Sequence, residues 1–286
     1  MNRVYLDHAA TTKPDQRVLE AMLAVYKEDW GNPSSIYLEG QQARRWVDQS
    51  RDRCASLLEV ESDELLFTSG GTESDNAAIR GVAFAQRELG LGTHIVTSQI
   101  EHHAVLHTVE QLEKEGFEAT YLPVDEQGII QMDTLADSIR EDTILLSLML
   151  ANNEVGSLQP VQKAAEVARE KNPHIVIHSD AVQGVGAVDI RPSALNIDLL
   201  TLAGHKFYGP KGIGLLYIRQ GTPWEPFVLG GGQEKERRGG TENVAGIVGF
   251  AVAFELALRE VEKKNTEIQK LRDRLLYEIP ELVPDT

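Results

Sequence analysis

The sequence has a single cysteine, no long apolar run and far fewer basic than acidic residues. Because Cys54 has no second cysteine to pair with, an intrachain disulfide is impossible, and this favours a reducing compartment. No apolar run approaches the ~18 residues that a membrane span needs, and the N-terminus has no apolar core of a secretion signal. These absences predict a cytoplasmic protein without membrane contact.

Positive charge is scarce: 28 basic residues face 44 acidic ones, which gives a net charge of −16 and an isoelectric point near 4.9. Such a surface repels phosphate groups, so we expect no direct binding of nucleic acid. The hydrophobic fraction of 42% and the charged fraction of 25% are typical of a soluble globular protein. The 286 residues can bury a large core in one domain or two.

Short apolar runs alternate with helical patterns along most of the chain. The apolar runs predict strands at residues 64–68, 94–98, 119–123, 143–149, 174–178, 199–203 and 213–218. The helical patterns predict helices at residues 15–26, 39–58, 73–89, 104–115, 134–140, 161–170, 244–263 and 265–277. Strands separated by helices of about ten to fifteen residues indicate an α/β fold with a mainly parallel central sheet and helices on both faces.

The only cysteine falls within the second predicted helix. Its neighbours at helical spacing are Ala43, Val47, Ser50 and Leu57. This spacing places Cys54 on the face that packs against the sheet. We therefore predict that Cys54 is a buried core residue and not a nucleophile, because burial disfavours the thiolate.

An acid and a lysine each follow a predicted strand. Asp180 comes soon after the apolar run 175–177, and Lys206, beside a histidine, follows the run 199–203. The carboxyl ends of parallel strands are where α/β enzymes gather their chemistry. A lysine amine can form a Schiff base with pyridoxal 5′-phosphate (PLP), and a carboxylate can keep the pyridine nitrogen protonated. The alternative is an ordinary acid and lysine at a sheet edge.

A glycine-containing turn, residues 69–76, joins a predicted strand to a predicted helix. Glycines permit a tight turn, and the exposed amides at the helix start, together with the Thr72 hydroxyl, can bind an anion. The alternative is a plain helix N-cap in which Thr72 and Asp75 form an approximate capping box.

Three further polar segments carry weaker signals. His102 follows a strand, where a histidine is usually structural but can also stack on a flat ring and move a proton. Residues 152–156 follow the strongest apolar run and are equally typical of a turn. The polar, glycine-rich stretch 230–243 is too long for a simple connection.

Taken together and in order, these segments closely resemble the cysteine desulfurases, a PLP-dependent family with the class V aminotransferase fold, which is fold type I. The resemblance runs from residue 4 to beyond residue 250. The matching segments are YLDHAATT (5–12), GNPSS (31–35), FTSGGTESDN (67–76), EH (101–102), NNEVG (152–156), DAVQ (180–183), GHK (204–206) and RGGT (238–241).

The resemblance implies a role for the residues around the PLP ring. Lys206 would form the Schiff base, and Asp180 would pair with the ring nitrogen. His102 would stack on the exposed face of the ring and act as an acid and base. Gln183 and Asn153 would hydrogen-bond the ring oxygen.

The resemblance also implies how the phosphate is held. Gly71, Thr72 and His205 would bind it within one subunit, and Thr241 would reach the phosphate site of a partner subunit in a homodimer. Many relatives carry a serine where this chain has Ala203, which can offer only its backbone.

The same resemblance implies three parts. Residues 1–14 would contribute to a small domain, residues 15–262 would form the large PLP-binding domain, and residues 263–286 would begin the small C-terminal domain. In relatives, the small domain supplies the nucleophilic cysteine and an arginine for the substrate carboxylate. Cys54 has no equivalent position, so we expect a C-terminally truncated chain without desulfurase turnover.

The implied activity is removal of sulfur from L-cysteine, which gives L-alanine and a protein-bound persulfide. The sulfur would pass to an acceptor protein for iron–sulfur cluster assembly or tRNA thiolation, and no metal is implied. One alternative is another class V PLP enzyme, such as a selenocysteine lyase or an aminotransferase, which its product from cysteine would reveal. The other is a non-catalytic PLP-binding scaffold, which an in-frame stop codon after Thr286 would favour.

Overall fold

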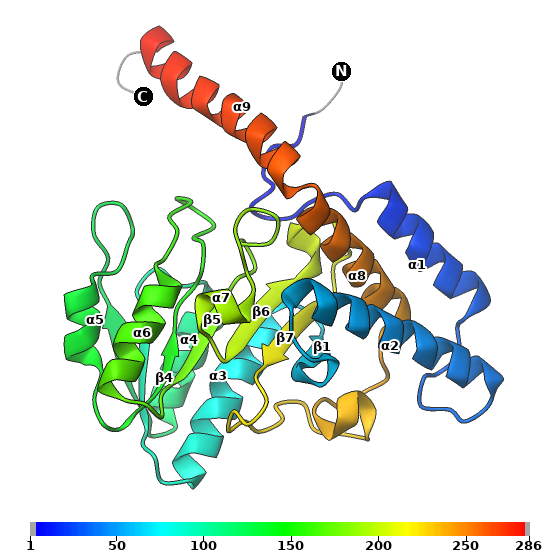
Figure 1. Ribbon diagram of the computed structural model, residues 1–286, viewed down its shortest axis with the longest axis horizontal. Coiled ribbons are helices and arrows are strands. Elements are labelled where there is room, and N and C mark those ends of the chain that lie inside the picture. The colour runs from blue at the N-terminus through cyan, green and yellow to red at the C-terminus, as the bar shows by residue number, and fades with distance from the viewer. Residues whose placement is uncertain (1–3, 284–286) are drawn as a thin grey trace.

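The computed structural model describes residues 4–283, apart from the side chains of residues 262–264. Within this part of the chain, seven strands form one sheet in the order β1-β7-β6-β5-β4-β2-β3 (Figure 1). Neighbouring strands are parallel except at β7, which runs antiparallel to both β6 and β1. This confirms the predicted, mainly parallel sheet. The strands are β1 (Leu65–Thr68), β2 (His94–Ser98), β3 (Glu118–Leu122), β4 (Thr143–Ser147), β5 (Val176–Asp180), β6 (Leu199–Ala203) and β7 (Gly214–Ile218).

Helices cover both faces of the sheet, as predicted. Helices α3 and α4 supply buried side chains to one apolar cluster, and α1, α2, α5, α6 and α8 supply a second cluster across the sheet. The helices are α1 (Gln16–Glu28), α2 (Leu38–Leu58), α3 (Gly71–Glu88), α4 (His103–Lys114), α5 (Met132–Ser138), α6 (Val161–Lys171), α7 (Pro192–Leu195), α8 (Val244–Arg259) and α9 (Val261–Leu282).

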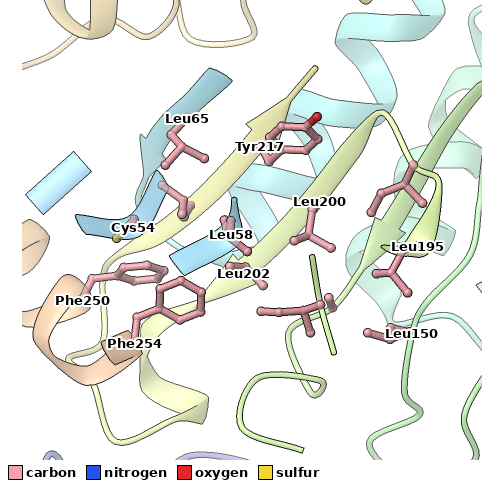
Figure 2. Close-up of a cluster of buried hydrophobic side chains, with 14 of the residues drawn as sticks. Cys54, Leu58, Leu65, Leu150, Leu195, Leu200, Leu202, Tyr217, Phe250 and Phe254 are labelled. Carbon is pink, nitrogen blue, oxygen red and sulfur yellow. The ribbon is translucent and has the colours of Figure 1, made fainter. Parts of the chain in front are cut away.

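All strands except the edge strand β3 are buried on both faces, and successive side chains alternate between the two clusters. On β7, Leu215 and Tyr217 enter one cluster, whereas Leu216 and Ile218 enter the other. Strands of this kind are continuous apolar runs in the sequence, which is why the sequence marks them clearly. Figure 2 shows the cluster in which the sheet meets Phe250 of α8.

The prediction for Cys54 is confirmed, because its side chain has no exposed surface and belongs to the cluster drawn in Figure 2. Leu57, predicted on the same face, is partly buried and packs against this cluster, and Leu58 is fully buried. Leu58 lies four positions after Cys54, about one helical turn, so it continues the buried face.

The sequence locates β2 and β6 at their observed bounds but misplaces one helix boundary. α8 ends at Arg259 and α9 begins at Val261, whereas the pattern predicts the break near residue 264. No glycine or proline marks the turn at Glu260, so the helical pattern continues through it. The pattern also fails to predict α7, because its four residues are too few to show a helical period.

Helix α9 extends away from the part of the molecule that holds the sheet, and its Leu271 and Leu275 side chains are exposed (Figure 1). No helix among the described residues combines the length and apolarity needed to cross a bilayer. The division into three parts stays a prediction. Residues 1–3 of the first predicted part and 284–286 of the last lie outside the described residues.

Candidate active site

A cavity of about 560 Å³ lies where the carboxyl ends of β4, β5 and β6 meet the start of α3. Open α/β sheets commonly bind ligands at this edge. Of the predicted site residues, all but Thr241 line it, namely Gly71, Thr72, His102, Asn153, Asp180, Gln183, Ala203, His205 and Lys206.

The first turn of α3 forms one end of the cavity. A side chain at Gly71 would place its Cβ 3.0 Å from Cγ2 of Val182, so glycine keeps this end open. The alternative, a capping box between Thr72 and Asp75, is not observed, because the N-cap of α3 is Gly70 and no side chain caps it. The backbone N–H of Ser69, just before the cap, donates to Oε2 of Glu73 at 2.9 Å. The helix start therefore presents N–H groups and the Thr72 hydroxyl to the cavity.

Asp180 ends β5 and is 7% exposed. The backbone N–H of Val182 donates to its Oδ1 at 2.9 Å, which fixes the carboxyl in the turn after the strand. Burial raises the pKa of Asp180, while this hydrogen bond and the positive charges of His102 and Lys206 oppose the rise. Asp180 therefore lines the cavity together with Lys206, whose charge favours the ionised carboxylate.

Lys206 sits in the short 3₁₀ turn Gly204–Lys206 that follows β6. Its Nζ donates to the carbonyl of Ala9 and, at 3.1 Å, to that of Ala10. Burial lowers the pKa of Lys206, and the charges of Asp180 and Asp7 oppose this shift. A lowered pKa makes the neutral, nucleophilic amine more available at physiological pH.

His102 is the N-cap of α4 and borders the same cavity. The backbone N–H of Ala104 donates to Nδ1 of His102 at 3.1 Å. This bond makes Nδ1 an acceptor, so a neutral ring carries its proton on Nε2. Nε2 can therefore donate a hydrogen bond into the cavity while the cap is kept, whereas protonation of the ring at Nδ1 would break the cap.

The N-terminal segment closes one side of the cavity, a contribution that residue types do not predict. Asp7, Ala9 and Ala10 line the cavity, and Nε2 of Gln183 donates to the Ala9 carbonyl at 3.0 Å. The Thr12 hydroxyl donates to the His205 carbonyl at 2.9 Å. Most of these contacts use backbone oxygens, which every residue carries, so only the resemblance at residues 5–12 signals them.

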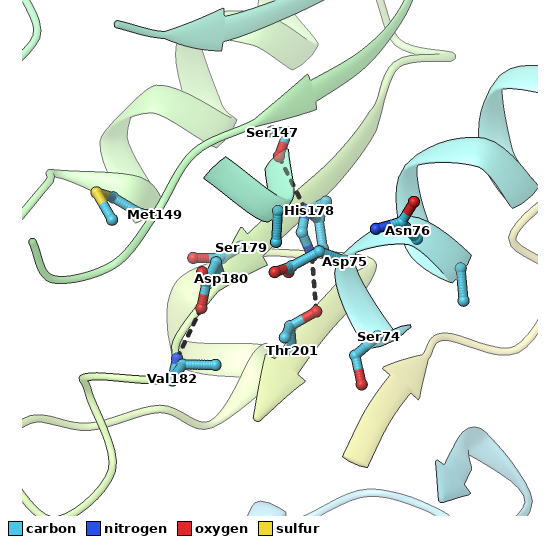
Figure 3. Close-up of polar contacts among 12 residues, drawn as sticks. Ser74, Asp75, Asn76, Ser147, Met149, His178, Ser179, Asp180, Val182 and Thr201 are labelled. Carbon is cyan, nitrogen blue, oxygen red and sulfur yellow. Dashed lines mark hydrogen bonds and ion pairs between the residues drawn. The ribbon is translucent and has the colours of Figure 1, made fainter. Parts of the chain in front are cut away.

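A buried polar layer lies behind the cavity (Figure 3). His178 on β5 is fully buried, with Nδ1 at 2.9 Å from the Ser147 hydroxyl and Nε2 at 3.1 Å from the Thr201 hydroxyl. Burial lowers the pKa of His178 to about 3, so its ring is neutral. Asp75 of α3 lies beside this ring and lines the cavity, a position that the sequence does not reveal.

Thr241 lines a second cavity of about 190 Å³, together with Ser69 and Arg238. Nε of Arg238 donates to Oε1 of Glu73 at 2.9 Å, which ties the stretch 230–243 to the start of α3. The structure therefore separates Thr241 from the first cavity within one chain.

The side chains of the first cavity fit PLP. A buried carboxylate suits a protonated pyridine nitrogen, an amine of lowered pKa suits an aldehyde, and a helix N-terminus suits a phosphate. The volume of about 560 Å³ is that of an ordinary cofactor site. Among the described residues, no group of three or more potential ligands could hold a metal ion.

Comparison with known proteins gives a consistent result. The chain matches the class-V aminotransferase family over residues 4–284. It is 54% identical over 273 residues to "Cysteine desulfurase IscS" of Methanosarcina thermophila, a match that covers 96% of this chain and 67% of the relative. It is 49% identical over 282 residues to the protein of the same name from Dictyoglomus turgidum, with 99% and 71% covered.

Solved structures agree with these matches. A "NifS-like protein" superposes with a TM-score of 0.96 at 41% identity, covering 99% of this chain and 77% of that chain. The structure described as "SspA in complex with cysteine" gives a TM-score of 0.84 at 40% identity, with 88% and 72% covered. At these identities and coverages, the chain belongs to the class-V aminotransferase family and, within it, to the cysteine desulfurases.

Proposed function

We propose that the first cavity binds PLP and L-cysteine, and that a thiolate other than that of Cys54 takes the sulfur as a protein-bound persulfide while L-alanine remains. The observation that carries this proposal is the convergence of Lys206, Asp180 and His102 on one cavity. The relatives named cysteine desulfurase give the substrate. They favour this reaction over the selenocysteine lyase, aminotransferase and scaffold alternatives.

Three side chains would carry the proton chemistry. PLP, when bound, supplies a ring that accepts the electron pair left on Cα of an amino acid. Lys206 would be the covalent attachment point and would then remove the Cα proton with its freed amine. Asp180 would hold the proton on the ring nitrogen by its negative charge. His102 would stack on the ring and act as an acid and base.

The remaining lining residues would position PLP. The first turn of α3, with Gly71 and Thr72, would bind the phosphate together with His205. Asn153 and Gln183 would hydrogen-bond the ring oxygen. The Gln183 amide donates to the Ala9 carbonyl in this structure, so it would turn toward the ring on binding. Ala203 would contribute only its backbone.

Sulfur transfer needs a thiolate other than that of Cys54. Burial raises the pKa of Cys54 to about 12, and the side chain has no exposed surface. Cys54 is also absent from the lining of the first cavity. A thiolate must lie within reach of the substrate sulfur to attack it, so Cys54 cannot supply the persulfide.

We further propose a homodimer in which Thr241 reaches the phosphate of the partner subunit, in keeping with its separation from the first cavity. Mixing Lys206→Ala with Thr241→Val chains tests this arrangement. If Thr241 acts across the interface, one site of each hybrid dimer carries neither change and the other carries both. If it acts within its own chain, each site carries one change, and mixing restores no Cα-proton exchange.

The finer biological proposals rest on the family. We propose that residues 15–262 form the PLP-binding domain, that residues 1–14 contribute to a small domain, and that residues 263–286 begin it. The exposed apolar side chains of α9 support a further packing partner for that last part. The sulfur acceptor would serve iron–sulfur cluster assembly or tRNA thiolation. The single buried thiol supports a cytoplasmic location.

Exchange of the Cα proton tests the proposed roles without requiring sulfur transfer. The chain is incubated with PLP and L-alanine in D2O, and deuterium at Cα is followed by mass spectrometry. Exchange above the free-PLP control is expected in the natural chain and is lost in Lys206→Ala. The matched control is Lys211→Ala, which removes a nearby exposed lysine. Equal exchange in both variants would overturn the assignment of Lys206.

A further inference from the structure

Three buried carboxyl groups lie close to one another at the first cavity: Asp180 and Asp75 line it, and Glu101 interacts electrostatically with both. Asp180 ends β5, Asp75 lies in the first turns of α3, and Glu101 precedes α4. They are 7%, 1% and 5% exposed. Buried charges are costly unless each is paired and hydrogen-bonded. Lys206 and the ring of His102 at the cavity act on Asp180 and oppose the rise in its pKa.

Asp75 has an oxygen that no donor reaches. Its Oδ1 is buried without a hydrogen-bond partner. The nearest ring nitrogen, Nε2 of His178, is 3.7 Å away, which is too long for a hydrogen bond. That nitrogen already contacts the Thr201 hydroxyl, and Nδ1 contacts the Ser147 hydroxyl. An ionised Asp75 would leave a charged oxygen unsolvated, whereas a protonated Asp75 would not.

Glu101 shows the same asymmetry. Its Oε1 accepts from the Ser98 hydroxyl at 2.6 Å and from the Met149 backbone N–H at 2.9 Å. Its Oε2 is buried and has no partner. Two donors on one oxygen and none on the other suit a carboxylic acid whose proton sits on Oε2.

We propose that Asp75 and Glu101 are neutral acids at physiological pH and that Asp180 carries the single negative charge of this buried cluster. Asp75 and Glu101 are then positioning residues, because they act through Asp180. Their neutrality leaves Asp180 free to respond to a cation placed in the cavity. The consequence for PLP rests on the proposed function, whereas the protonation states themselves do not.

The electrostatics of the cluster agree with this geometry. Burial raises the pKa of Asp75 well above its ordinary value, and the charges of Asp180 and Glu101 add to the rise against a hydrogen bond with Thr201. Burial raises the pKa of Glu101 to about 8 against its hydrogen bonds to Ser98 and Met149, with the charge of Asp180 adding to the rise. Of the three acids, only Asp180 has a raised pKa that His102 and Lys206 oppose.

Carbon-13 NMR of the PLP-free chain, labelled on the side-chain carboxyls of aspartate and glutamate, tests the proposal. At pH 7 we expect one aspartate and one glutamate signal at the shift of a neutral acid. The first disappears in Asp75→Asn and the second in Glu101→Gln, while both persist in Asp180→Asn. Asp142→Asn is the matched control, because the hydrogen bond from Arg140, together with its charge, lowers the pKa of that partly exposed aspartate and keeps it ionised.

Several outcomes would overturn the proposal. They are a wild-type spectrum with every carboxyl ionised at pH 7, a neutral aspartate signal that only Asp180→Asn removes, and an imidazolium at His178 in nitrogen-15 spectra. The wild-type spectrum is decisive even if a variant fails to fold. Because PLP is left out, failure of PLP binding is separate from failure of this inference.

A pH titration of stability gives an independent readout. The folded-state pKa of Glu101 lies above its unfolded value, so the folded chain holds an extra proton between them. The contribution of this proton to the free energy of unfolding is complete below the pKa of the unfolded chain and is lost as the pH rises through about 8. Between about pH 5 and about pH 9, the melting temperature of Glu101→Gln should therefore fall less than that of wild type. A fall of equal size would contradict the inference.

Discussion

Glu234→Ala is expected to destabilise the protein strongly, although Glu234 lies in a short 3₁₀ segment, Gln233–Glu236, outside the sheet and the α-helices. Arg51 of α2 binds the Glu234 carboxylate with two nitrogens, Nη2 to Oε1 at 2.6 Å and Nη1 to Oε2 at 2.9 Å. The backbone N–H of Phe67 donates to the same Oε2 at 3.0 Å. The side chains of Arg51 and Glu234 are only 8% and 2% exposed. The variant would leave a buried guanidinium without its counter-ion.

The expected magnitude follows from that burial. Removing one partner of a buried ion pair costs about 3–5 kcal/mol, because the remaining charge stays desolvated. For a chain of this size, 1 kcal/mol corresponds to about 2 °C in melting temperature. Glu234→Ala should therefore melt roughly 6–10 °C below wild type.

The neighbouring residue supplies the control. Lys235 pairs with Asp63, but these side chains are 61% and 77% exposed. An exposed pair contributes about 0–1 kcal/mol, so Lys235→Ala should shift melting by no more than about 2 °C. Thermal unfolding followed by circular dichroism measures both shifts. Similar melting temperatures for the two variants would refute the reasoning.

A double replacement adds a second test of the same pair. Arg51→Met together with Glu234→Met removes both charges and fills the space with apolar side chains. Such exchanges are often close to neutral, so the double variant should be more stable than Glu234→Ala. If the double variant is no more stable, the loss of stability in Glu234→Ala comes from the segment around Glu234 and not from the unpaired charge of Arg51.

Three further predictions concern the site. Asp180→Asn should keep bound PLP, because the charge of Asp180 acts on the ring nitrogen and not on the phosphate. The variant should slow Cα-proton exchange about 10²–10³-fold, which corresponds to the ~3–4 kcal/mol typical of preorganised electrostatics. Absorbance measures bound PLP, and an unchanged rate of exchange would contradict the role of Asp180. Because burial lowers the pKa of Lys206 below the ordinary 10.5, PLP capture should remain fast as the pH falls below that value. Stopped-flow absorbance measures it, with Lys206→Ala as the blank, and a midpoint at 10.5 would argue against the shift. Residues 1–286 should release no alanine from L-cysteine above a free-PLP control, since the pKa of Cys54 is raised to about 12. Alanine that vanishes in Cys54→Ser would place that thiol within reach of the substrate.

The sheet was predictable because six of its seven strands are buried on both faces. The short segments 94–98, with β-branched Ile95, Val96 and Thr97, and 199–203, mostly apolar, become β2 and β6 without change. A turn that carries no glycine or proline gives no such signal, so the bend at Glu260 is invisible in the sequence. Periodicity reports which face is buried and not where the axis changes direction.

The site was predictable only in part, and the limits are physical. Asp180 and Lys206 stand directly at strand ends, so the topology brings them together. Asp75 resembles an ordinary helix-start acid, and only the packing of α3 over β5 and β6 buries it. The carbonyls of Ala9 and Ala10 have no side-chain signature at all. The pairing of Glu234 with Arg51 joins residues 183 positions apart, which no local pattern can report.

The N-terminal segment also sets an order of events during synthesis. Its contacts to His205, Lys206 and Tyr208 each span 193 to 197 residues of chain. The N-terminal residues are synthesised first but can make these contacts only after the residues that follow β6 have been synthesised. Forming contacts between residues so far apart in the sequence is slow. The half-built cavity is open on that side until translation passes residue 208. We therefore expect PLP to bind late in synthesis, because the first cavity gains its N-terminal lining residues only after this long loop has closed.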